Sequence, residues 1–418
     1  MKALVQLLGL FVAMGASLAS AETVRLLPDR VFDGQNMHED WAVRVEGDVI
    51  VAVGPAAEVS GNGARDIDLA GQTLMPGLIE GHSHILLHPY DEVSWNDQVL
   101  KESIAERSVR GAQHLRAQLH SGFTTLRDLG AEGAGYADIG LKQALEKGVI
   151  EGPRLIVAGP AMVATGSYGP KGFADHVTVP LGAEEADGDS VVQVARKHIG
   201  RGADFIKVYA DYRWGPDGTA SATFSVAEMS DIRTVAELSG RYMVAHASSA
   251  GAMQNAISAG VRSIEHGDGG TPEIFAAMAA DGIYWCPTLA AGEAISTYRG
   301  WQKGKDPEPL RIKEKKRAFI TALEAGVPMC MGGDVGVYDH GDGVWEMELM
   351  VEYGMEPLQV LRSATSVNAQ MMGLQDKIGS LAPGKVADMI AVDGNPAVDI
   401  STLRHIKFIL QGGHRVLQ

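Results

Sequence analysis

Short apolar runs alternate with amphipathic stretches between residues 73 and 378, and this alternation limits the folds open to the chain. The amphipathic stretches, such as 103–119 and 226–238, have the spacing of surface helices. The candidate strands are 74–79, 124–129, 154–158, 205–209, 242–245, 263–265, 284–288 and 328–332. Strands that alternate with helices predict a parallel sheet covered by helices. Eight of them favour a (β/α)8 TIM-like barrel, which takes up about 250 residues, over an open sheet.

The two ends of the chain differ from this middle. Residues 22–72 and 379–418 contain short strand-like runs separated by Gly, Asp and Pro. Both ends therefore share a β-rich character that the segment 73–378 lacks. We expect one small β-sandwich-like domain built from both chain ends, next to the barrel domain.

The first residues have the pattern of a secretory signal peptide. Lys2 precedes an apolar run over 4–18, and Ala19-Ser20-Ala21 has the small-x-small form of a cleavage site. A membrane anchor is the alternative, but the run is shorter than the ~20 residues that a membrane span needs. We expect residues 1–21 to be removed, no membrane association afterwards, and a periplasmic or secreted protein.

Charge and cysteine content narrow the partners and the chemistry. Lys and Arg number 36 against 52 Asp and Glu, for a net charge of −16, so nucleic acid is not expected as a partner. Cys286 and Cys330 both lie in apolar strand-like runs, which favours two buried free thiols. A disulfide is the alternative, because an exported protein can form one.

Residues that can bind metals follow the predicted strands. His82 and His84 come after the first strand and, two residues apart on an extended segment, point the same way. His246, His266 and Asp334 end three later strands. Because strand ends meet at one mouth of a barrel, these side chains are expected to converge. Nitrogen and oxygen ligands without thiolates suit Zn²⁺, with Mn²⁺, Co²⁺ or Fe²⁺ as alternatives.

Lys207 lies inside the strand 205–209, between Ile206 and Val208. Burial of an ammonium is expensive, so such a lysine tends to lose its proton. A neutral amine can react with CO₂ to give a carbamate, which is an anionic ligand able to bridge two cations. The alternative, equally open at this point, is a lysine that points outward to a helix.

Residues 76–84, which end in Gly81-His82-Ser83-His84, resemble the opening motif of the amidohydrolase superfamily. The ending 378–388 resembles the return of that superfamily into its small β-domain. The remaining metal ligands of the superfamily match, in order, Lys207, His246, His266 and Asp334. Within the superfamily the chain looks closest to the binuclear imidazolonepropionase-like and prolidase-like branch, and it resembles bacterial amidohydrolases that hydrolyse ochratoxin A.

The resemblance implies two divalent metal ions, most simply Zn²⁺. His82, His84 and Asp334 would hold one ion, His246 and His266 the other, and a CO₂-derived carbamate on Lys207 would bridge them. Asp334 would take the proton of a metal-activated water and pass it to the leaving nitrogen. Tyr209 resembles a tyrosine that helps place the substrate in such enzymes, and its hydroxyl is also a candidate donor to the oxyanion. Relatives of this kind also imply a possible homo-oligomer.

The implied substrates are small-molecule amides: N-acyl amino acids or dipeptides, including ochratoxin A-type amides. Tyr168 and His88 are candidate substrate contacts. Tyr168 ends the run Thr165-Gly166-Ser167-Tyr168, where several dipeptidase-like relatives carry a histidine, so a cationic partner for a substrate carboxylate is lost. The aromatic side chains Tyr284, Trp285 and Tyr338 belong either to the cavity or to the core.

Three other functions remain open. A cyclic amide hydrolase of the imidazolone or hydantoin type would use the same metals. A non-catalytic periplasmic metal-binding protein would need no general base such as Asp334. A Ser–His–Asp hydrolase is disfavoured because the chain has no Gly-x-Ser-x-Gly motif.

Overall fold

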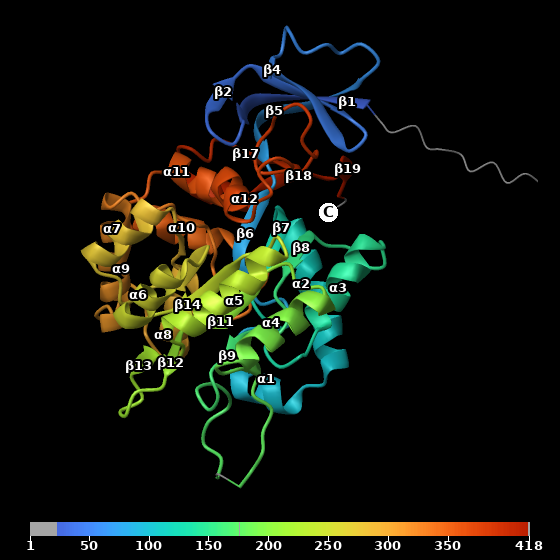
Figure 1. Ribbon diagram of the computed structural model, residues 1–418. Coiled ribbons are helices and arrows are strands. Elements are labelled where there is room, and N and C mark those ends of the chain that lie inside the picture. The colour runs from blue at the N-terminus through green and yellow to red at the C-terminus, as the bar shows by residue number, and fades with distance from the viewer. Residues whose placement is uncertain (1–22, 175, 417–418) are drawn as a thin grey trace, which may run out of the picture.

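The computed structural model describes residues 23–174 and 176–416 (Figure 1). The expected signal peptide, residues 1–21, lies outside the described residues. Within the described ranges, no helix combines the length and the apolar character that a membrane crossing requires.

Strands from both ends of the chain form one eight-stranded sheet, which lies at the top of Figure 1. Its order is β19-β18-β17-β5-β1-β3-β4, and β2 pairs with β1. Buried and less buried residues alternate along the start of β1, so one face of the strand covers a core that contains Leu26, Val43 and Phe408. The strands are β1 (Thr23–Phe32), β2 (Met37–Glu39), β3 (Trp41–Glu46), β4 (Val49–Pro55), β5 (Arg65–Pro76), β17 (Met389–Asp393), β18 (Ile406–Gln411) and β19 (His414–Arg415).

The predicted strand 74–79 is in fact two strands in two sheets. β5 ends at Pro76, which pairs with Met389 of the end sheet, whereas β6 (Leu78–Ser83) pairs with β7. Gly77 lies between them against the Thr124 side chain, with no room for a Cβ atom. Both strands are buried where they meet, so the apolar run continues through the boundary and hides it.

The middle of the chain contains two parallel sheets. β6, β7 (Phe123–Asp128) and β8 (Arg154–Val157) form the first. The second has the order β10-β9-β11-β14-β15-β16. Its strands are β9 (Met162–Val163), β10 (Glu184–Glu185), β11 (Ile206–Tyr209), β14 (Met243–Ala247), β15 (Ser263–His266) and β16 (Tyr284–Cys286). A separate hairpin pairs β12 (Asp211–Arg213) with β13 (Ala220–Ala222).

The segment 328–335 runs between the two parallel sheets without forming a regular strand. It makes parallel bridges from Met329 to Trp285 of β16 and from Val335 to Ser83 of β6. The predicted strand 328–332 is therefore an extended segment with isolated pairing. The other predicted strands agree with β7, β8, β11, β14, β15 and β16 to within two residues at each end.

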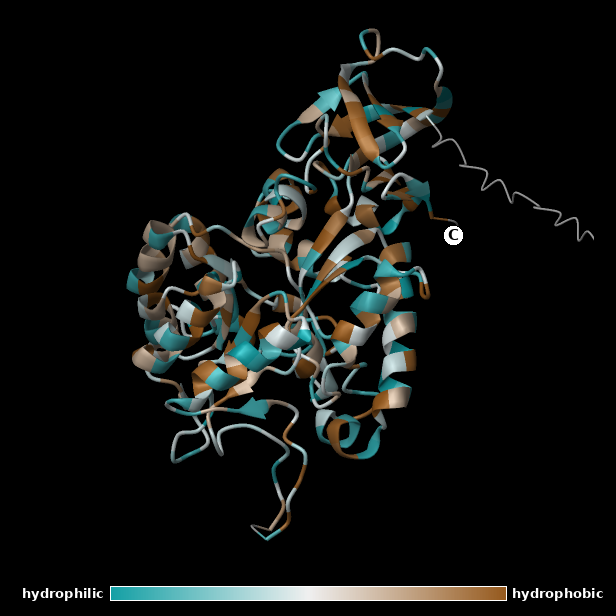
Figure 2. Ribbon diagram, turned by 45° about the vertical axis from the view of Figure 1, so that its right-hand side comes forward, coloured by the Kyte–Doolittle hydropathy of each residue, from teal (hydrophilic) through white to brown (hydrophobic). Residues whose placement is uncertain are grey.

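Helices follow the parallel strands, and hydrophilic and hydrophobic residues are mixed along them, as expected of helices with one buried face (Figure 2). Local signals define several helix ends: Ser225 and Glu228 form a capping box before α5, and Gly202 and Gly260 end α4 and α6 in the left-handed conformation. The helices are α1 (Trp95–Lys101), α2 (Ile104–His120), α3 (Ala137–Glu146), α4 (Ser190–Arg201), α5 (Val226–Leu238), α6 (Ala250–Ala259), α7 (Pro272–Asp281), α8 (Leu289–Tyr298), α9 (Leu310–Glu324), α10 (Val344–Glu352), α11 (Pro357–Arg362), α12 (Asn368–Met371), and the short η1 (Ser363–Val367) and η2 (Ile400–Arg404).

Cys286 and Cys330 form a disulfide, so the prediction of two free thiols was wrong. The bridge between Trp285 and Met329 sets β16 beside the segment 328–335 and brings the two cysteine Cα atoms to 4.6 Å. That separation lies within the range that a disulfide needs. A buried thiol and a buried disulfide have the same apolar surroundings, so the sequence pattern could not distinguish them.

Candidate metal centre

Side chains from four parallel strands and from the segment 328–335 converge at the carboxyl ends of the strands. The ring centroid of His82 lies 5.4 Å from that of His84 and 5.1 Å from that of His266. The rings of His246 and His266 are 4.4 Å apart. Asp334 Oδ1 lies 3.5 Å from Nε2 of both His82 and His84. The structure thus brings the four histidines and the aspartate to one point.

Lys207 of β11 belongs to the same cluster. Its side chain is buried, and its Nζ lies 5.4 Å from the ring centroid of Tyr209. Burial lowers the pKa of Lys207 to about 8, while the nearby carboxylates of Glu265 and Asp334 act in the opposite direction. The charge of Lys207 also helps to lower the pKa of His82. The lysine therefore faces the histidine cluster and not the outer helices.

In each of the four histidines, one ring nitrogen has a polar partner in the protein, and the other ring nitrogen remains to bind a metal ion. A metal-binding histidine usually bonds its other nitrogen to a carboxylate, carbonyl or hydroxyl. Such partners are present: Glu265 Oε2 at 2.9 Å from His82 Nδ1, the Gly130 carbonyl at 3.0 Å from His84 Nδ1, Thr288 Oγ1 at 2.8 Å from His266 Nδ1, and Asp211 Oδ1 at 3.4 Å from His246 Nε2.

The atoms left over fit a metal ion. His82 Nε2 and Asp334 Oδ1 are buried and have no hydrogen-bond partner. Ligand atoms of His82, His266 and Asp334 all lie within 4.8 Å of one another. A buried polar atom without a partner is costly in an apolar interior, and a shared cation would remove that cost. The residues present therefore suit a divalent cation bound by nitrogen and oxygen ligands.

Burial controls the ionisation of the same groups. It lowers the pKa of His82 and of His266 well below the ordinary value, with further lowering from neighbouring cationic groups. It raises the pKa of Asp334 well above the ordinary value, although Lys207 acts in the opposite direction. The two imidazoles are therefore kept neutral, which is the form that binds metals.

The backbone around the cluster is strained. Five residues other than glycine have a positive φ in the described part of the chain, and four of them surround the cluster: Glu132 at 44°, His266 at 71°, Thr288 at 52° and Asp334 at 63°. This conformation is unfavourable for residues with a Cβ atom and collects at functional sites. Its concentration here supports a functional role for the cluster.

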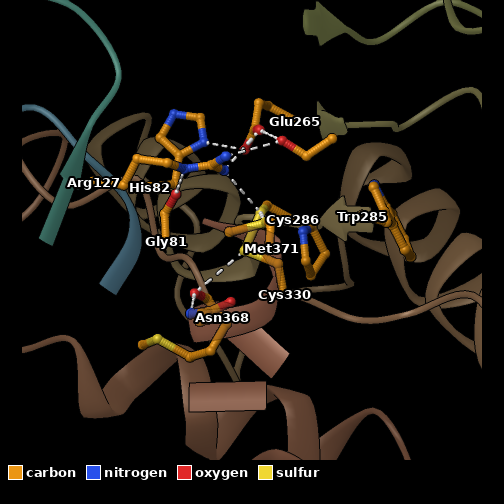
Figure 3. The surroundings of a disulfide bond; sticks show 12 residues. Gly81, His82, Arg127, Glu265, Trp285, Cys286, Cys330, Asn368 and Met371 are labelled. Carbon is orange, nitrogen blue, oxygen red and sulfur yellow. Dashed lines mark hydrogen bonds and ion pairs between the residues drawn. A yellow bond between two sulfur atoms is a disulfide. The ribbon is translucent and has the colours of Figure 1, made fainter. Parts of the chain in front are cut away.

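A buried arginine holds the partner of His82 (Figure 3). Arg127 Nη2 donates to Glu265 Oε1 at 2.9 Å, and Arg127 Nε donates to the Gly81 carbonyl at 2.7 Å. Arg127 Nη2 also lies 3.4 Å from Cys286 Sγ of the disulfide. Glu265 is thus fixed between Arg127 and His82, and the disulfide lies directly behind this arrangement.

A second buried carboxylate connects the two segments that carry the candidate ligands. Glu80 Oε1 accepts hydrogen bonds from the backbone N–H groups of His82 and Gly333, each at 2.9 Å. Gly333 precedes Asp334 directly, so Glu80 fixes the position of β6 relative to the segment 328–335. The sequence did not single out Glu80, although it lies within the recognised motif.

A cavity of about 480 Å³ opens over the cluster and includes His84, His246, His266 and Asp334 in its wall. Its aromatic residues are Tyr90, Trp95, Tyr168, Tyr209 and Tyr212, and its basic residues are Lys171, Arg213, Arg299 and Arg311. A larger hollow of about 620 Å³, near Arg233 and Gln370, includes none of the cluster residues. The smaller cavity is therefore the candidate substrate site.

The structure brings some of the predicted substrate residues to this cavity and leaves others out. Tyr168 and Tyr209 lie in its wall. His88 does not, because its Nδ1 lies 2.9 Å from Glu92 and its Nε2 lies 2.8 Å from Glu102. Both ring nitrogens of His88 are thus occupied by carboxylates outside the cavity.

The aromatic residues Tyr284, Trp285 and Tyr338 belong to the core and not to the cavity wall. Trp285 is fully buried and donates from Nε1 to the His266 carbonyl at 3.1 Å. Trp285 therefore supports the segment that carries the candidate ligand His266.

Glu132 is a cavity residue that sequence reasoning missed. Its Oε2 accepts hydrogen bonds from the Tyr168 hydroxyl at 2.8 Å and from Trp95 Nε1 at 2.9 Å. Its Oε1 accepts one from the Tyr209 hydroxyl at 3.1 Å. Glu132 follows the strand 124–129 by three residues, and this position after a strand is the signal that could have identified it.

Comparisons with known proteins identify the family of the chain. The model of the amidohydrolase family matches residues 73–416. Ochratoxinase of Aspergillus niger is 28% identical over 409 residues, covering 90% of this chain and 82% of that protein. Imidazolonepropionase of Deinococcus deserti is 23% identical over 407 residues, covering 90% of this chain and 92% of that protein.

A solved structure of a Xaa-Pro dipeptidase with methionine in its active site superimposes with a TM-score of 0.83 at 28% identity, covering 94% of this chain and all of that one, 100%. The similar proteins thus include an ochratoxinase and a dipeptidase, which sets aside a non-catalytic metal-binding protein. The chain is a hydrolytic enzyme and belongs to the amidohydrolase family.

Proposed function

We propose that this enzyme is a metal-dependent hydrolase that cleaves the amide bonds of dipeptide-like substrates or N-acyl amino acids, including ochratoxin A-type amides. The observation that carries the proposal is the convergence of four histidines, Lys207 and Asp334 at the base of one cavity. The similarity to ochratoxinase and to a Xaa-Pro dipeptidase, both at 28% identity, supports an amide as the bond that is cleaved.

The proposal includes the architecture that the sequence predicts. The two parallel sheets would be the two parts of one (β/α)8 barrel, with the segment 328–335 as its eighth strand. The parallel bridges of that segment to β16 and to β6 support this closure. The end sheet would then be the small domain formed by both chain ends.

Two divalent ions, most simply Zn²⁺, would be held by the converging side chains. His82, His84 and Asp334 would hold one ion and His246 and His266 the other, with the carbamate of Lys207 between them. A cation bound there supplies Lewis acidity, which lowers the pKa of water and polarises an amide carbonyl. Glu265 and Thr288 orient His82 and His266 so that the Nε2 atom of each is available.

Asp334 is the proposed general acid and base. Its Oδ1 is buried, has no hydrogen-bond partner, and lies at the base of the cavity. A carboxylate in that position can take a proton from the attacking water and deliver it to the leaving nitrogen. The left-handed backbone at Asp334 and the backbone hydrogen bond from Asp334 N–H to the His82 carbonyl at 2.9 Å fix its direction.

From the sequence, Tyr209 is expected either to help place the substrate or to stabilise the oxyanion. Its hydroxyl donates to Glu132 at 3.1 Å, and its ring stacks on His246 at 4.6 Å. The hydroxyl hydrogen is therefore directed at a carboxylate, which favours the first of these roles. We propose that Tyr209 positions the substrate and does not stabilise the oxyanion.

The protein is proposed to act in the periplasm or outside the cell. The disulfide Cys286–Cys330 supports this location, because structural disulfides persist in oxidising compartments and are rare in the cytosol. Assembly into a homo-oligomer stays a prediction.

The test is a panel of dipeptides, N-acyl amino acids and cyclic imides, assayed with the wild-type enzyme and with Asp334→Asn. We expect hydrolysis of the linear amides by the wild type, and a loss of about 10²–10⁴-fold in kcat for the variant, typical of a lost general acid–base group. Near-normal turnover by Asp334→Asn would refute the role of Asp334. Hydrolysis of cyclic imides alone would favour the imidazolone or hydantoin type of activity instead.

A further inference from the structure

The carboxylate of Glu132 forms one wall of the substrate cavity, 2% exposed, and has only neutral hydrogen-bond donors around it. These donors are the hydroxyls of Tyr168 and Tyr209 and the indole N–H of Trp95. In the described part of the chain, the one ion pair to this carboxylate is with His84, whose Nδ1 lies 3.9 Å away and bonds to the Gly130 carbonyl. No described lysine or arginine therefore forms an ion pair with the Glu132 carboxylate, although the charges of Arg107 and Lys207 interact with it at longer range.

The two tyrosine hydroxyls point their hydrogens at this carboxylate. A tyrosine has a single O–H hydrogen, and an ionised carboxylate can only accept hydrogen bonds. Because Tyr168 and Tyr209 both donate to Glu132, their oxygens offer lone pairs to anything else that approaches. This part of the cavity wall therefore accepts hydrogen bonds and donates none from these three residues.

The loop that carries Glu132 is held rigidly. Glu132 has a φ of 44°, and Arg107 donates from Nη1 to the Glu132 carbonyl at 2.6 Å and from Nε to the Leu86 carbonyl at 2.9 Å. Arg107 is itself buried. A strained residue anchored by a buried arginine keeps its carboxylate in one place, which a specific subsite requires.

The charge pattern of the cavity selects one kind of ligand for this wall. A substrate carboxylate placed there would meet a like charge in surroundings of low dielectric constant, which is unfavourable. An ammonium group or an N–H donor would be attracted and hydrogen-bonded. A cation for a substrate carboxylate exists elsewhere in the wall: Arg311, 40% exposed, whose Nε lies 3.5 Å from Asp268.

We propose that Glu132, together with Tyr168 and Tyr209, is the subsite for the free amino group of the substrate, and that Glu132 determines specificity for unblocked dipeptides over N-acyl amino acids. This inference rests on the proposed amide hydrolase function. It states that the cavity prefers dipeptides over N-acyl amino acids. Near Tyr168, where several relatives carry a histidine that could pair with a substrate carboxylate, this chain would bind a positively charged amino group.

The test compares alanyl-phenylalanine with propionyl-phenylalanine, which has the same shape and lacks only the amino group. With the metal-loaded wild-type enzyme, we expect kcat/KM to be at least about tenfold higher for the dipeptide, since a hydrogen bond to a charged group is stronger than one between neutral groups. In Glu132→Gln the ratio of the two kcat/KM values should fall to near one, mainly through the loss of dipeptide turnover.

Glu102→Gln is the matched control. Glu102 is a largely buried carboxylate that bonds to His88 at 2.8 Å and is not part of the cavity wall, so its replacement should leave the ratio unchanged. If Glu132→Gln does not fold, Glu132→Asp withdraws the carboxylate by one methylene and should also lower the ratio.

Equal turnover of the two substrates by the wild type, or an unchanged ratio in a folded Glu132 variant, would overturn the subsite while leaving the amide hydrolase function intact. Failure of the metal-loaded enzyme to hydrolyse either substrate or any other linear amide would overturn both.

Discussion

At the scale of single residues, buried polar groups fix the orientation of the candidate ligands through hydrogen bonds. Glu265 is the clearest case, because it bonds to His82 Nδ1 at 2.9 Å and is itself held by Arg127. None of these groups is exposed, so their cost must be offset by the hydrogen bonds that they form. This arrangement fixes the imidazole of His82 so that its Nε2 atom points toward the candidate metal centre.

Glu265→Gln should weaken metal binding by roughly 10–100-fold, because partners of ligating histidines typically contribute that much. The glutamine keeps the size of the side chain but loses the charge that holds the imidazole. Titration of the metal-free protein with Zn²⁺ measures the effect, and Glu102→Gln serves again as the control. An unchanged zinc affinity in Glu265→Gln would argue that His82 is not a ligand.

Lys207→Ala should abolish or strongly reduce binding of the metal ions, because it removes the proposed bridging carbamate between them. A short carboxylic acid such as acetate can occupy the space left by the side chain and supply an equivalent carboxylate. Activity that returns as acetate is added would support the carbamate. Full metal content and full activity in Lys207→Ala without acetate would be incompatible with it.

At the scale of elements, β6 and the segment 328–335 approach each other closely because glycines line their contact. A Cβ atom on Gly81 would lie 2.5 Å from Cys330 Sγ and 2.7 Å from the Met331 carbonyl oxygen. Neither neighbour can move easily, because the first is part of a disulfide and the second accepts a backbone hydrogen bond from Gly81. His82 lies on β6 and Asp334 on the segment 328–335, so this contact sets the distance between them.

Gly81→Ala should therefore destabilise the protein by about 1–3 kcal/mol, as overpacking does in a tight interior, and it should also reduce metal affinity. Gly140→Ala in α3 is the control: a Cβ atom there meets nothing within 4 Å, and alanine is favoured over glycine in a helix by roughly 0.5–1 kcal/mol. Denaturant unfolding measures both. A Gly81→Ala protein as stable as the control would show that the contact is looser than described.

The disulfide acts on the same elements. Replacement of both Cys286 and Cys330 by alanine should lower the free energy of unfolding by about 2–4 kcal/mol, the usual contribution of a disulfide. The cysteines are 44 residues apart in sequence and join β16 to the segment 328–335, behind Arg127 and Glu265. Thermal unfolding of the double variant checks this, and equal midpoints for variant and wild type would contradict it.

At the scale of the whole molecule, the sequence predicts β7, β8, β11, β14, β15 and β16 because each lies in a short apolar run, whereas β9 and β10, with two residues each, could not be predicted. The same property leads to the candidate ligands, since His246 and His266 directly follow the predicted runs 242–245 and 263–265, and His82 follows the run 74–79 by three residues. The boundary at Gly77 could not be predicted, because the apolar run continues from the end sheet into β6.

The parts of the site that sequence reasoning missed depend on contacts between distant segments. The role of Glu132 depends on hydrogen bonds from Tyr168, Tyr209 and Trp95, which lie on three other segments of the chain. Conversely, the position of His88 in a loop suggested a contact with the substrate, but Glu92 and Glu102 lie within hydrogen-bonding distance of its two ring nitrogens. Long-range hydrogen bonds of this kind leave no periodic pattern in a sequence.

The most direct test of the account is the number of metal ions bound per chain in the purified protein, measured by inductively coupled plasma mass spectrometry beside His246→Ala and His82→Ala. The account predicts two divalent ions per chain in the wild type and fewer in each variant. A wild-type protein that binds no divalent metal after saturation and removal of the excess, or variants that keep both ions, would contradict it.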